Sequence, residues 1–231
     1  MMKAFVINLD KNPERLAFMQ EQFRRFGMDV ERFPAVYGKA LTPEELRRDH
    51  SRIRSYIAFQ KRMEPPKVAV ALSHSGVYQT IIDRDLPYAL VLEDDVVIDA
   101  GFSEALQRAE KFLDPTRPQV VAFNGYGLEN ADTCVPEIRE VSRMWCADAY
   151  VITRPAAERI RHANYPVLTS ADSFKRYHRR HGVELYRVLP ATVRQDNERF
   201  ATENQESPKA PWYLRLPLRG LDWVLWKLTG R

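Results

Sequence analysis

The sequence predicts an α/β fold built on an open, Rossmann-like sheet. The opening carries part of this prediction, because an apolar strand at 4–9, a helix and a second strand at 30–36 follow one another. Strand–helix–strand is the usual start of an open α/β sheet. A longer apolar strand at 88–92 ends in three acidic residues, as expected where a sheet edge forms a binding site. The length of 231 residues and the hydrophobic content of 45% suit one such domain.

The elements after the first strand are expected from helical spacing and turn residues. Pro13 begins a helix and Gly27 ends it. Its apolar residues recur at helical spacing: Leu16, Met19, Phe23 and Phe26. The run 42–45 has the composition of a helix start, with Thr as the cap and Pro in the first turn. The basic stretch 47–62 is weakly patterned and is expected to be a mobile helix or loop, and 69–83 predicts a helix.

Later strands are expected at three further apolar runs. These are 119–124, 147–153 and 185–188, and Arg154 and Pro155 begin a helix after the second of them. The first of these strands is expected to end at a Gly-rich turn, 125–127. The short apolar run 96–98 directly follows the acidic cluster.

The acidic cluster Glu93-Asp94-Asp95 is the strongest candidate for a binding site. Neighbouring side chains of a strand point to opposite faces, so Glu93 and Asp95 share a face and Asp94 takes the other. Carboxylates held close together raise each other's pKa unless a cation neutralises them. Mg²⁺ or Mn²⁺ accepts such hard oxygen ligands and bridges substrate phosphates. The alternative is a solvated acidic turn with no ligand.

Composition and charge exclude several other classes. The net charge of +4 is mild, and no basic run dominates the first two hundred residues, so no nucleic-acid partner is expected. Cys134 and Cys146 lack metal-ligand spacing, which argues against zinc, and two reduced thiols are favoured over a disulfide. The first ten residues do not resemble a signal peptide, and no apolar run is long enough to span a bilayer. We therefore expect a cytoplasmic protein.

The end of the chain changes character after residue 201. We place a first domain at 1–205 and a linker with a basic tail at 206–231. As a helix, the tail is amphipathic, and Pro217 and Gly220 interrupt the pattern so that two short helices would also fit it. Its aromatic and aliphatic residues alternate with basic ones: Trp212, Leu216, Trp223, Trp226, Arg215, Arg219 and Lys227. This pattern is typical of a helix in the plane of an anionic membrane, and a helix docked on its own domain or on a twin subunit is the alternative.

Several segments together resemble glycosyltransferase family 25, the lipooligosaccharide-type galactosyl- and glucosyltransferases to which the collagen galactosyltransferases are related. The segments keep the family's order over roughly 3–175 (an estimate from motif placement). They are 5–10 with 13–15, 71–74 with 77–78, 87–96, 149–153 with 156–158, and Asp172. The stretch 67–71 departs from the family pattern, and the chain from Tyr177 onward matches poorly.

The resemblance implies a single GT-A-like domain that binds a UDP-sugar through an acidic motif and a divalent metal, Mn²⁺ or Mg²⁺. It implies inverting transfer of a hexose, galactose or glucose, to a lipid-linked saccharide of the lipooligosaccharide type. A β-galactosyltransferase is the expected enzyme, with peripheral contact at the inner face of the cytoplasmic membrane. A metal-dependent phosphohydrolase of the haloacid-dehalogenase type is one alternative, although Glu93 stands where that chemistry needs an aspartate nucleophile. A non-catalytic membrane-associated scaffold is the other.

We expect specific side chains to bind the donor. Glu93 and Asp95 are the predicted metal ligands. Asp94 is expected to bond the ribose or a neighbouring loop, and a solvent-facing acid is the alternative. Asn8 ends the first strand, at the edge where open sheets bind nucleotides. The other predicted donor-binding residues are Arg15, Ser73 and His74, each with a surface or structural alternative.

Asp172 is the expected general base. Inverting transfer needs a base that takes the proton of the acceptor hydroxyl. Asp172 follows a loop-like stretch at 166–171 that can place it over the strand ends. Its alternative role is the cap of a helix at 173–177. Asp148 is the reserve candidate for the base, and Asp196 is a further candidate for the metal shell.

Overall fold

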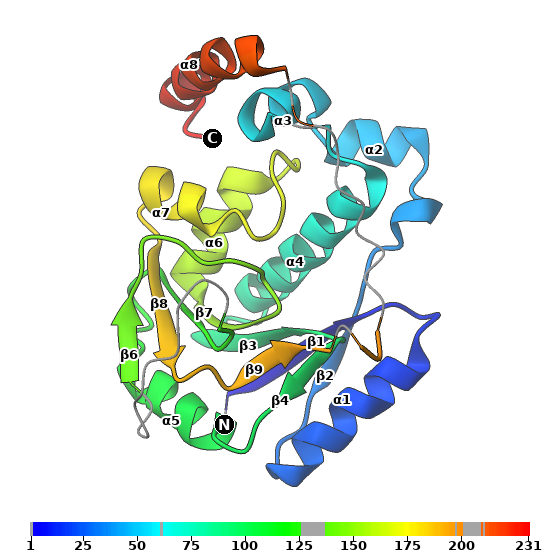
Figure 1. Cartoon of the computed structure of the whole chain (residues 1–231), viewed down its shortest axis with the longest axis vertical. Helices are drawn as coiled ribbons and strands as arrows, with labels where there is room; N and C mark the ends of the chain where they lie inside the picture. Colours follow the sequence, from blue (N-terminus) through cyan, green and yellow to red (C-terminus); the bar gives the residue numbers. More distant parts are fainter. Residues whose placement is uncertain (1, 61, 126–136, 197, 201–208, 210) are drawn as a thin grey trace.

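The computed structural model describes residues 2–60, 62–125, 137–196, 198–200, 209 and 211–231, without the side chains of 212, 214 and 216 (Figure 1). Its strands are β1 (Lys3–Asn8), β2 (Glu31–Pro34), β3 (Tyr88–Glu93), β4 (Val96–Ile98), β5 (Gln119–Ala122), β6 (Glu137–Glu140), β7 (Ala149–Thr153), β8 (Glu184–Leu189) and β9 (Val193–Gln195). Its helices are α1 (Pro13–Arg25), the short 3₁₀ helix η1 (Gly38–Ala40), α2 (Pro43–Asp49), α3 (Arg52–Phe59), α4 (Pro65–Asp83), α5 (Phe102–Phe112), α6 (Arg154–Asn164), α7 (Phe174–His181) and α8 (Trp212–Thr229).

A seven-stranded mixed sheet forms the centre, in the order β2-β1-β3-β7-β5-β8-β6. Strands β2, β1, β3, β5 and β8 run in one direction, while β7 and β6 run against them. A separate antiparallel pair, β4 and β9, lies beside the end of β3. The predicted α/β class is therefore confirmed, and the mixed sheet is consistent with a Rossmann-like domain. The antiparallel β7 in the middle of the sheet is a feature that the strand pattern did not predict.

The two faces of the sheet carry separate apolar layers, as the alternation along each strand requires. On β1, Phe5 and Ile7 pack beneath α4, α6 and α7, whereas Ala4 and Val6 face α1 and α5. Figure 1 shows the same division, with α4 and α6 on one side of the sheet and α1 and α5 on the other. Helix α5 was not predicted, although Phe102, whose side chain is fully buried, begins a helically spaced apolar face.

The basic stretch 47–62 forms ordered structure over its described part. Helix α2 has the predicted Thr42 cap, because Thr42 Oγ1 accepts from Glu45 N and the Glu45 side chain accepts from Thr42 N. Helix α3 follows directly and ends at Phe59, and the next residue, Gln60, caps it in a left-handed conformation. The predicted helix at 69–83 begins earlier, at Pro65, because the two prolines at 65 and 66 occupy its first turn.

The tail is a single helix, α8, which continues through Pro217 and Gly220. It packs against α3, and its Asp222 pairs with Arg176 and Arg180 of α7. The proposed boundary at residue 205 lies outside the described residues. No helix within the described ranges combines the length and the apolar character needed to cross a membrane.

Candidate active site

The acidic cluster lies where three strands meet. Strands β1 and β3 are parallel, with Ile7 opposite Glu93, so both end at the same sheet edge. Strand β7 is antiparallel to β3 and begins at that edge, where Glu93 N donates to Asp148 O over 2.8 Å. The ends of β1 and β3 and the start of β7 therefore bring Asn8, the acidic cluster and Asp148 together.

Asp94 is held by residues of the first strand and helix. Asn8 Nδ2 donates to Asp94 Oδ2 over 2.7 Å, and Arg15 Nη1 lies 3.2 Å from Asp94 Oδ1. Asn8 is almost fully buried, and its Oδ1 accepts from Arg32 Nε over 3.0 Å. The charge of Asp94 is thus balanced within the protein, which suits a positioning role.

Glu93 and Asp95 are less well balanced than Asp94. Burial, assisted by the negative charge of Asp148 and Asp94, raises the pKa of Glu93 to about 8. Burial, assisted by Glu93 and Asp94, raises the pKa of Asp95 to about 7. Asp95 Oδ1 is buried without a hydrogen-bond partner among the described residues. A cation beside Glu93 and Asp95 would reduce the repulsion between the two carboxylates and would give Asp95 Oδ1 a partner.

His74 supports Glu93 from inside the protein. Its side chain is 1% exposed, its Nε2 lies 3.3 Å from Glu93 Oε1, and burial lowers its pKa to about 4. Its Nδ1 lies 2.8 Å from the Tyr150 hydroxyl, which lies 2.7 Å from the Tyr78 hydroxyl. When the neutral ring donates from Nε2 to Glu93, Nδ1 accepts from Tyr150, so the buried chain fixes the tautomer.

A cavity of about 240 Å³ opens beside this edge. It is lined by the acidic cluster, by Arg15, and by the segment around η1 with the start of α4. Ser73 also lines it and links these parts, because its Oγ accepts from Val36 N over 2.9 Å and donates to Ala69 O. Asn8 does not line the cavity and contacts it through Asp94. We call this the first cavity.

A second cavity of about 400 Å³ adjoins the first and shares Glu93 and Val70 with it. Asp172 lines this second cavity and is exposed, directly before Ser173 and α7. Ser173, rather than Asp172, occupies the N-cap position of that helix. Glu93 and Asp172 are far apart in the sequence and therefore line the second cavity from different elements.

The two reserve candidates have other surroundings. Asp148 is fully buried and lines neither cavity, and its Oδ1 accepts from the side-chain amide of Asn124 and from Ala149 N. Asp196 donates from its backbone N to Asp95 O, while its carboxylate accepts from Arg199 N. Neither side chain has the exposure and position of Asp172.

The residues at the strand ends suit a divalent cation only in part. Among the described residues, no group of three or more His, Cys, Asp or Glu side chains is spaced to hold a metal ion. Glu93 and Asp95 nevertheless line the first cavity with hard oxygen donors, and Asp95 Oδ1 has no partner. Two carboxylates completed by substrate phosphates are a usual environment for Mg²⁺. The donor set therefore fits a cation that arrives with a phosphate ligand.

Residues 1–175 match the family described as glycosyltransferase family 25 (LPS biosynthesis protein). This match covers every residue that lines the first cavity and all that line the second except Gln195. It extends from β1 to the start of α7. The chain belongs to glycosyltransferase family 25. The resemblance expected from the sequence motifs is thereby confirmed.

Individual relatives match shorter parts. A glycosyltransferase 25 family member of Drosophila pseudoobscura pseudoobscura is 30% identical over 152 residues, which cover 63% of this chain and 22% of the relative. Human procollagen galactosyltransferase 2 is 24% identical over 170 residues, 69% of this chain and 27% of the relative. Lacto-N-neotetraose biosynthesis glycosyltransferase LgtB of Neisseria meningitidis is 29% identical over 112 residues, 48% of this chain and 37% of the relative. The chain spans less than two fifths of each of these relatives.

Several lining residues of this family-25 chain were not singled out from the sequence. Lys11 and Lys39 bring positive charge to the first cavity, and Lys67 does so in the second. Lys11 lies three residues after Asn8, which the sequence already placed at the nucleotide-binding edge, so that position was the available signal. Cys146 lines the second cavity as a free thiol whose pKa burial raises to about 12, and Cys134 lies outside the described residues.

Proposed function

We propose that this chain transfers a hexose from a UDP-sugar to a saccharide acceptor, with inversion, in a GT-A-like domain. The observation that carries the proposal is the pair of adjoining cavities that share Glu93. A transferase must hold a donor and an acceptor side by side, whereas a phosphohydrolase needs room for one phosphoester and water. The family match also favours the transferase over the phosphohydrolase and the scaffold.

The first cavity suits the nucleotide diphosphate. Arg15, Lys11 and Lys39 supply positive charge around it, and Glu93 with Asp95 would hold Mn²⁺ or Mg²⁺ against the phosphates. When bound, such an ion neutralises the diphosphate and stabilises the charge of the departing UDP. Asn8 and Arg15 hold Asp94 in place beside these two ligands.

The second cavity suits the acceptor, and Asp172 is the proposed base within it. As the acceptor oxygen bonds to the anomeric carbon, the bond from that carbon to the UDP oxygen breaks. The hydroxyl proton passes to the Asp172 carboxylate, and the electron pair of the broken bond leaves with UDP. Attack from the cavity opposite the leaving group inverts the anomeric carbon.

Galactose is the proposed donor sugar, with glucose as the alternative. The support is the printed name of the human relative, a procollagen galactosyltransferase. The name LgtB, for lacto-N-neotetraose biosynthesis, and the family description for LPS biosynthesis support a saccharide acceptor of the lipooligosaccharide type, carried on lipid. The human relative is 24% identical to this chain and LgtB is 29% identical. The donor sugar and the acceptor are therefore proposed for this chain from distant relatives.

A product assay tests the proposal. The purified chain would be incubated with UDP-galactose or UDP-glucose, a lactose- or glucosamine-ended oligosaccharide, and either Mn²⁺ or EDTA. We expect UDP release and an extended oligosaccharide with one donor, in Mn²⁺ only. Release of inorganic phosphate from the donor or from a phosphomonoester would instead support the phosphohydrolase. Neither product, with no nucleotide bound, would support the scaffold.

A further inference from the structure

Helix α8 packs on the protein through the side that carries Asp222, with Leu225 and Trp226 partly buried beside it. Asp222 is 7% exposed and accepts from Arg176 Nη1 over 2.7 Å and from Arg176 Nη2 over 3.1 Å. Arg180 Nη1 lies 2.7 Å from Asp222 Oδ2, and the Arg180 guanidinium stacks on Trp226 at 5.5 Å. A carboxylate shared by two arginines fixes the rotation of α8 about its axis.

The side of α8 away from Asp222 faces solvent and is rich in apolar residues, with Lys227 among them. Successive helix residues are about 100° apart, so Tyr213, Val224 and Leu228 lie on this side, and Leu221 and Trp223 flank it. The exposed residues of this side are Tyr213 (62%), Leu221 (45%), Trp223 (53%), Val224 (43%) and Leu228 (78%). An ordinary surface helix buries its apolar side and exposes its charges. In α8 the apolar side chains away from Asp222 are exposed together with Arg215, Arg219 and Lys227, which marks an interaction surface.

Helix α3 extends this surface. Arg54 Nη2 donates to Thr229 Oγ1 over 3.1 Å and to Arg231 O over 2.9 Å, which joins α3 to the end of α8. Ile53, the preceding residue, is 78% exposed. Figure 1 shows α8 and α3 together at the end of the molecule farthest from α5 and α1. We call Ile53 with the five exposed α8 residues the apolar end.

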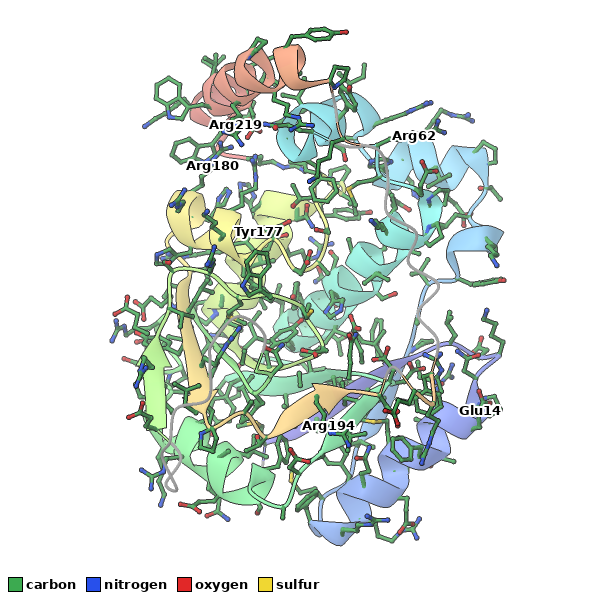
Figure 2. The ribbon with its side chains drawn as sticks, viewed as in Figure 1. Glu14, Arg62, Tyr177, Arg180, Arg194 and Arg219 are labelled. Carbon is green, nitrogen blue, oxygen red and sulfur yellow. The ribbon has the colours of Figure 1, made fainter. Side chains whose placement is uncertain are left out.

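Positive charge surrounds the apolar end. Helices α3, α7 and α8 carry nine Lys and Arg residues, and Asp222 is their one acidic residue. Figure 2 shows Arg180 and Arg219 beside α8, and Arg62 beyond the end of α3. A positively charged rim around exposed aromatic and aliphatic side chains is complementary to an anionic lipid surface, where headgroups meet the rim and acyl chains meet the apolar side.

We propose that the apolar end is a membrane-docking surface that binds anionic phospholipid bilayers peripherally. The docked α8 lies flat, with the Asp222 side on the protein and the Trp223, Val224 and Leu228 side in the interface. Docking in this orientation combines the two alternatives that the tail sequence left open, because the helix packs on its own domain and also keeps apolar side chains outward.

This orientation relates the bilayer to the second cavity. Phe59, the last residue of α3, lines that cavity, while Arg54 of the same helix holds α8. One short helix therefore connects the membrane-docking surface to the cavity proposed for the acceptor. This step rests on the proposed function: an acceptor saccharide carried on lipid would enter from the bilayer side.

Vesicle co-sedimentation of the full chain tests the docking surface directly. The probes are vesicles of phosphatidylcholine alone and of phosphatidylcholine mixed with phosphatidylglycerol. We expect binding to the mixed vesicles only, and a fall of about tenfold or more for the triple variant Trp223→Ser, Val224→Ser, Leu228→Ser, because apolar area drives insertion. The matched control, Phe112→Ser, removes an exposed aromatic side chain of α5 and should bind as the unchanged chain does.

Three outcomes would overturn the proposal. These are absence of binding to the mixed vesicles, equal binding by the triple variant, and a chain that is dimeric by light scattering and becomes monomeric in the triple variant. The last result would assign the surface to a second copy. Lys227→Glu offers an independent check. It keeps the apolar residues and replaces a positive charge by a negative one, so it should weaken binding to the anionic mixed vesicles. UDP binding needs no vesicle, so failure of docking and failure of the transferase proposal are distinguished.

Discussion

Asn8 Nδ2 donates to Asp94 Oδ2 across 2.7 Å and joins the ends of two parallel strands that are 86 residues apart in the chain. This bond fixes the middle carboxylate of the acidic cluster. It follows from the register of β1 and β3, in which Ile7 lies opposite Glu93 and the next residues of both strands meet. Asp94 lines the first cavity together with Glu93 and Asp95.

Replacing Asn8 by Ala should destabilise the protein by about 2 kcal/mol, because Asp94 and Arg32 each lose a buried hydrogen bond. Urea unfolding of the purified protein measures this free energy. The matched control is Gln79→Ala, which removes an exposed bond to Asp83 and should cost less than about 0.5 kcal/mol. Equal costs for the two variants would contradict the positioning role of Asn8.

Replacing Asp172 by Asn should lower kcat by a factor of about 100 or more, because the acceptor hydroxyl loses its base. UDP affinity should stay unchanged, since Asp172 lines only the second cavity. Turnover and UDP titration are measured on the same preparation. Lys175→Ala, an exposed change on α7, is the control and should turn over as the unchanged chain does. Retained turnover in the Asn variant would exclude Asp172 as the base.

Replacing Gly38 by Ala should weaken UDP binding by about tenfold, because the η1 segment and the start of α4 both line the first cavity. A Cβ at Gly38 would lie 2.6 Å from Pro66 Cα, so these two segments must separate. Calorimetric titration with UDP gives the affinity. Gly220→Ala is the matched control, because a Cβ there meets no atom within 4 Å. Unchanged affinity in the Gly38 variant would show that the cavity tolerates the displacement.

The stability of the metal-free protein should fall as the pH rises from about 6.5 to about 8. Burial raises the pKa of Asp95 to about 7 and that of Glu93 to about 8, so the folded chain holds more protons there than the unfolded chain does. Burial lowers the pKa of His74, and its opposing effect is confined to lower pH because an unfolded histidine is mostly neutral above about 6.5.

Thermal midpoints in EDTA across this range measure the effect. Asp95→Asn removes one of the two groups, so its midpoint should fall less steeply with pH and should exceed that of the unchanged chain at about pH 8. A midpoint that is flat or rises over the same range would show that the two carboxyl groups have ordinary proton affinities.

Local patterns in the sequence were sufficient to predict the strands of the sheet centre. Strands β1, β3 and β7 are continuous apolar runs bounded by polar residues, and the acidic cluster follows the strongest of them. The alternation rule placed Asp94 on the face opposite Glu93 and Asp95, and this was wrong, because β3 ends at Glu93 and all three residues line the first cavity. The GT-A assignment, the domain boundary and the roles of the site residues stay predictions.

Long-range pairing accounts for what the sequence could not predict. No local signal makes β7 antiparallel, and only this direction places Asp148 beside Glu93. The burial of His74 depends on Tyr150, which is 76 residues away. The orientation of α8 depends on Asp222 meeting Arg176, 46 residues earlier. A helical wheel of the tail shows its apolar and basic sides, and it does not show which side meets the protein.

The most direct test of the central claim is calorimetric titration of the full chain with UDP, in Mn²⁺ and again in EDTA. We predict binding in the micromolar range (about −8 kcal/mol) that requires Mn²⁺ and is lost in Asp95→Asn, whose circular dichroism should match that of the unchanged chain. Equal UDP binding in EDTA, or full binding by Asp95→Asn, would contradict a metal held by the acidic cluster. No UDP binding in either buffer would contradict a UDP-sugar donor.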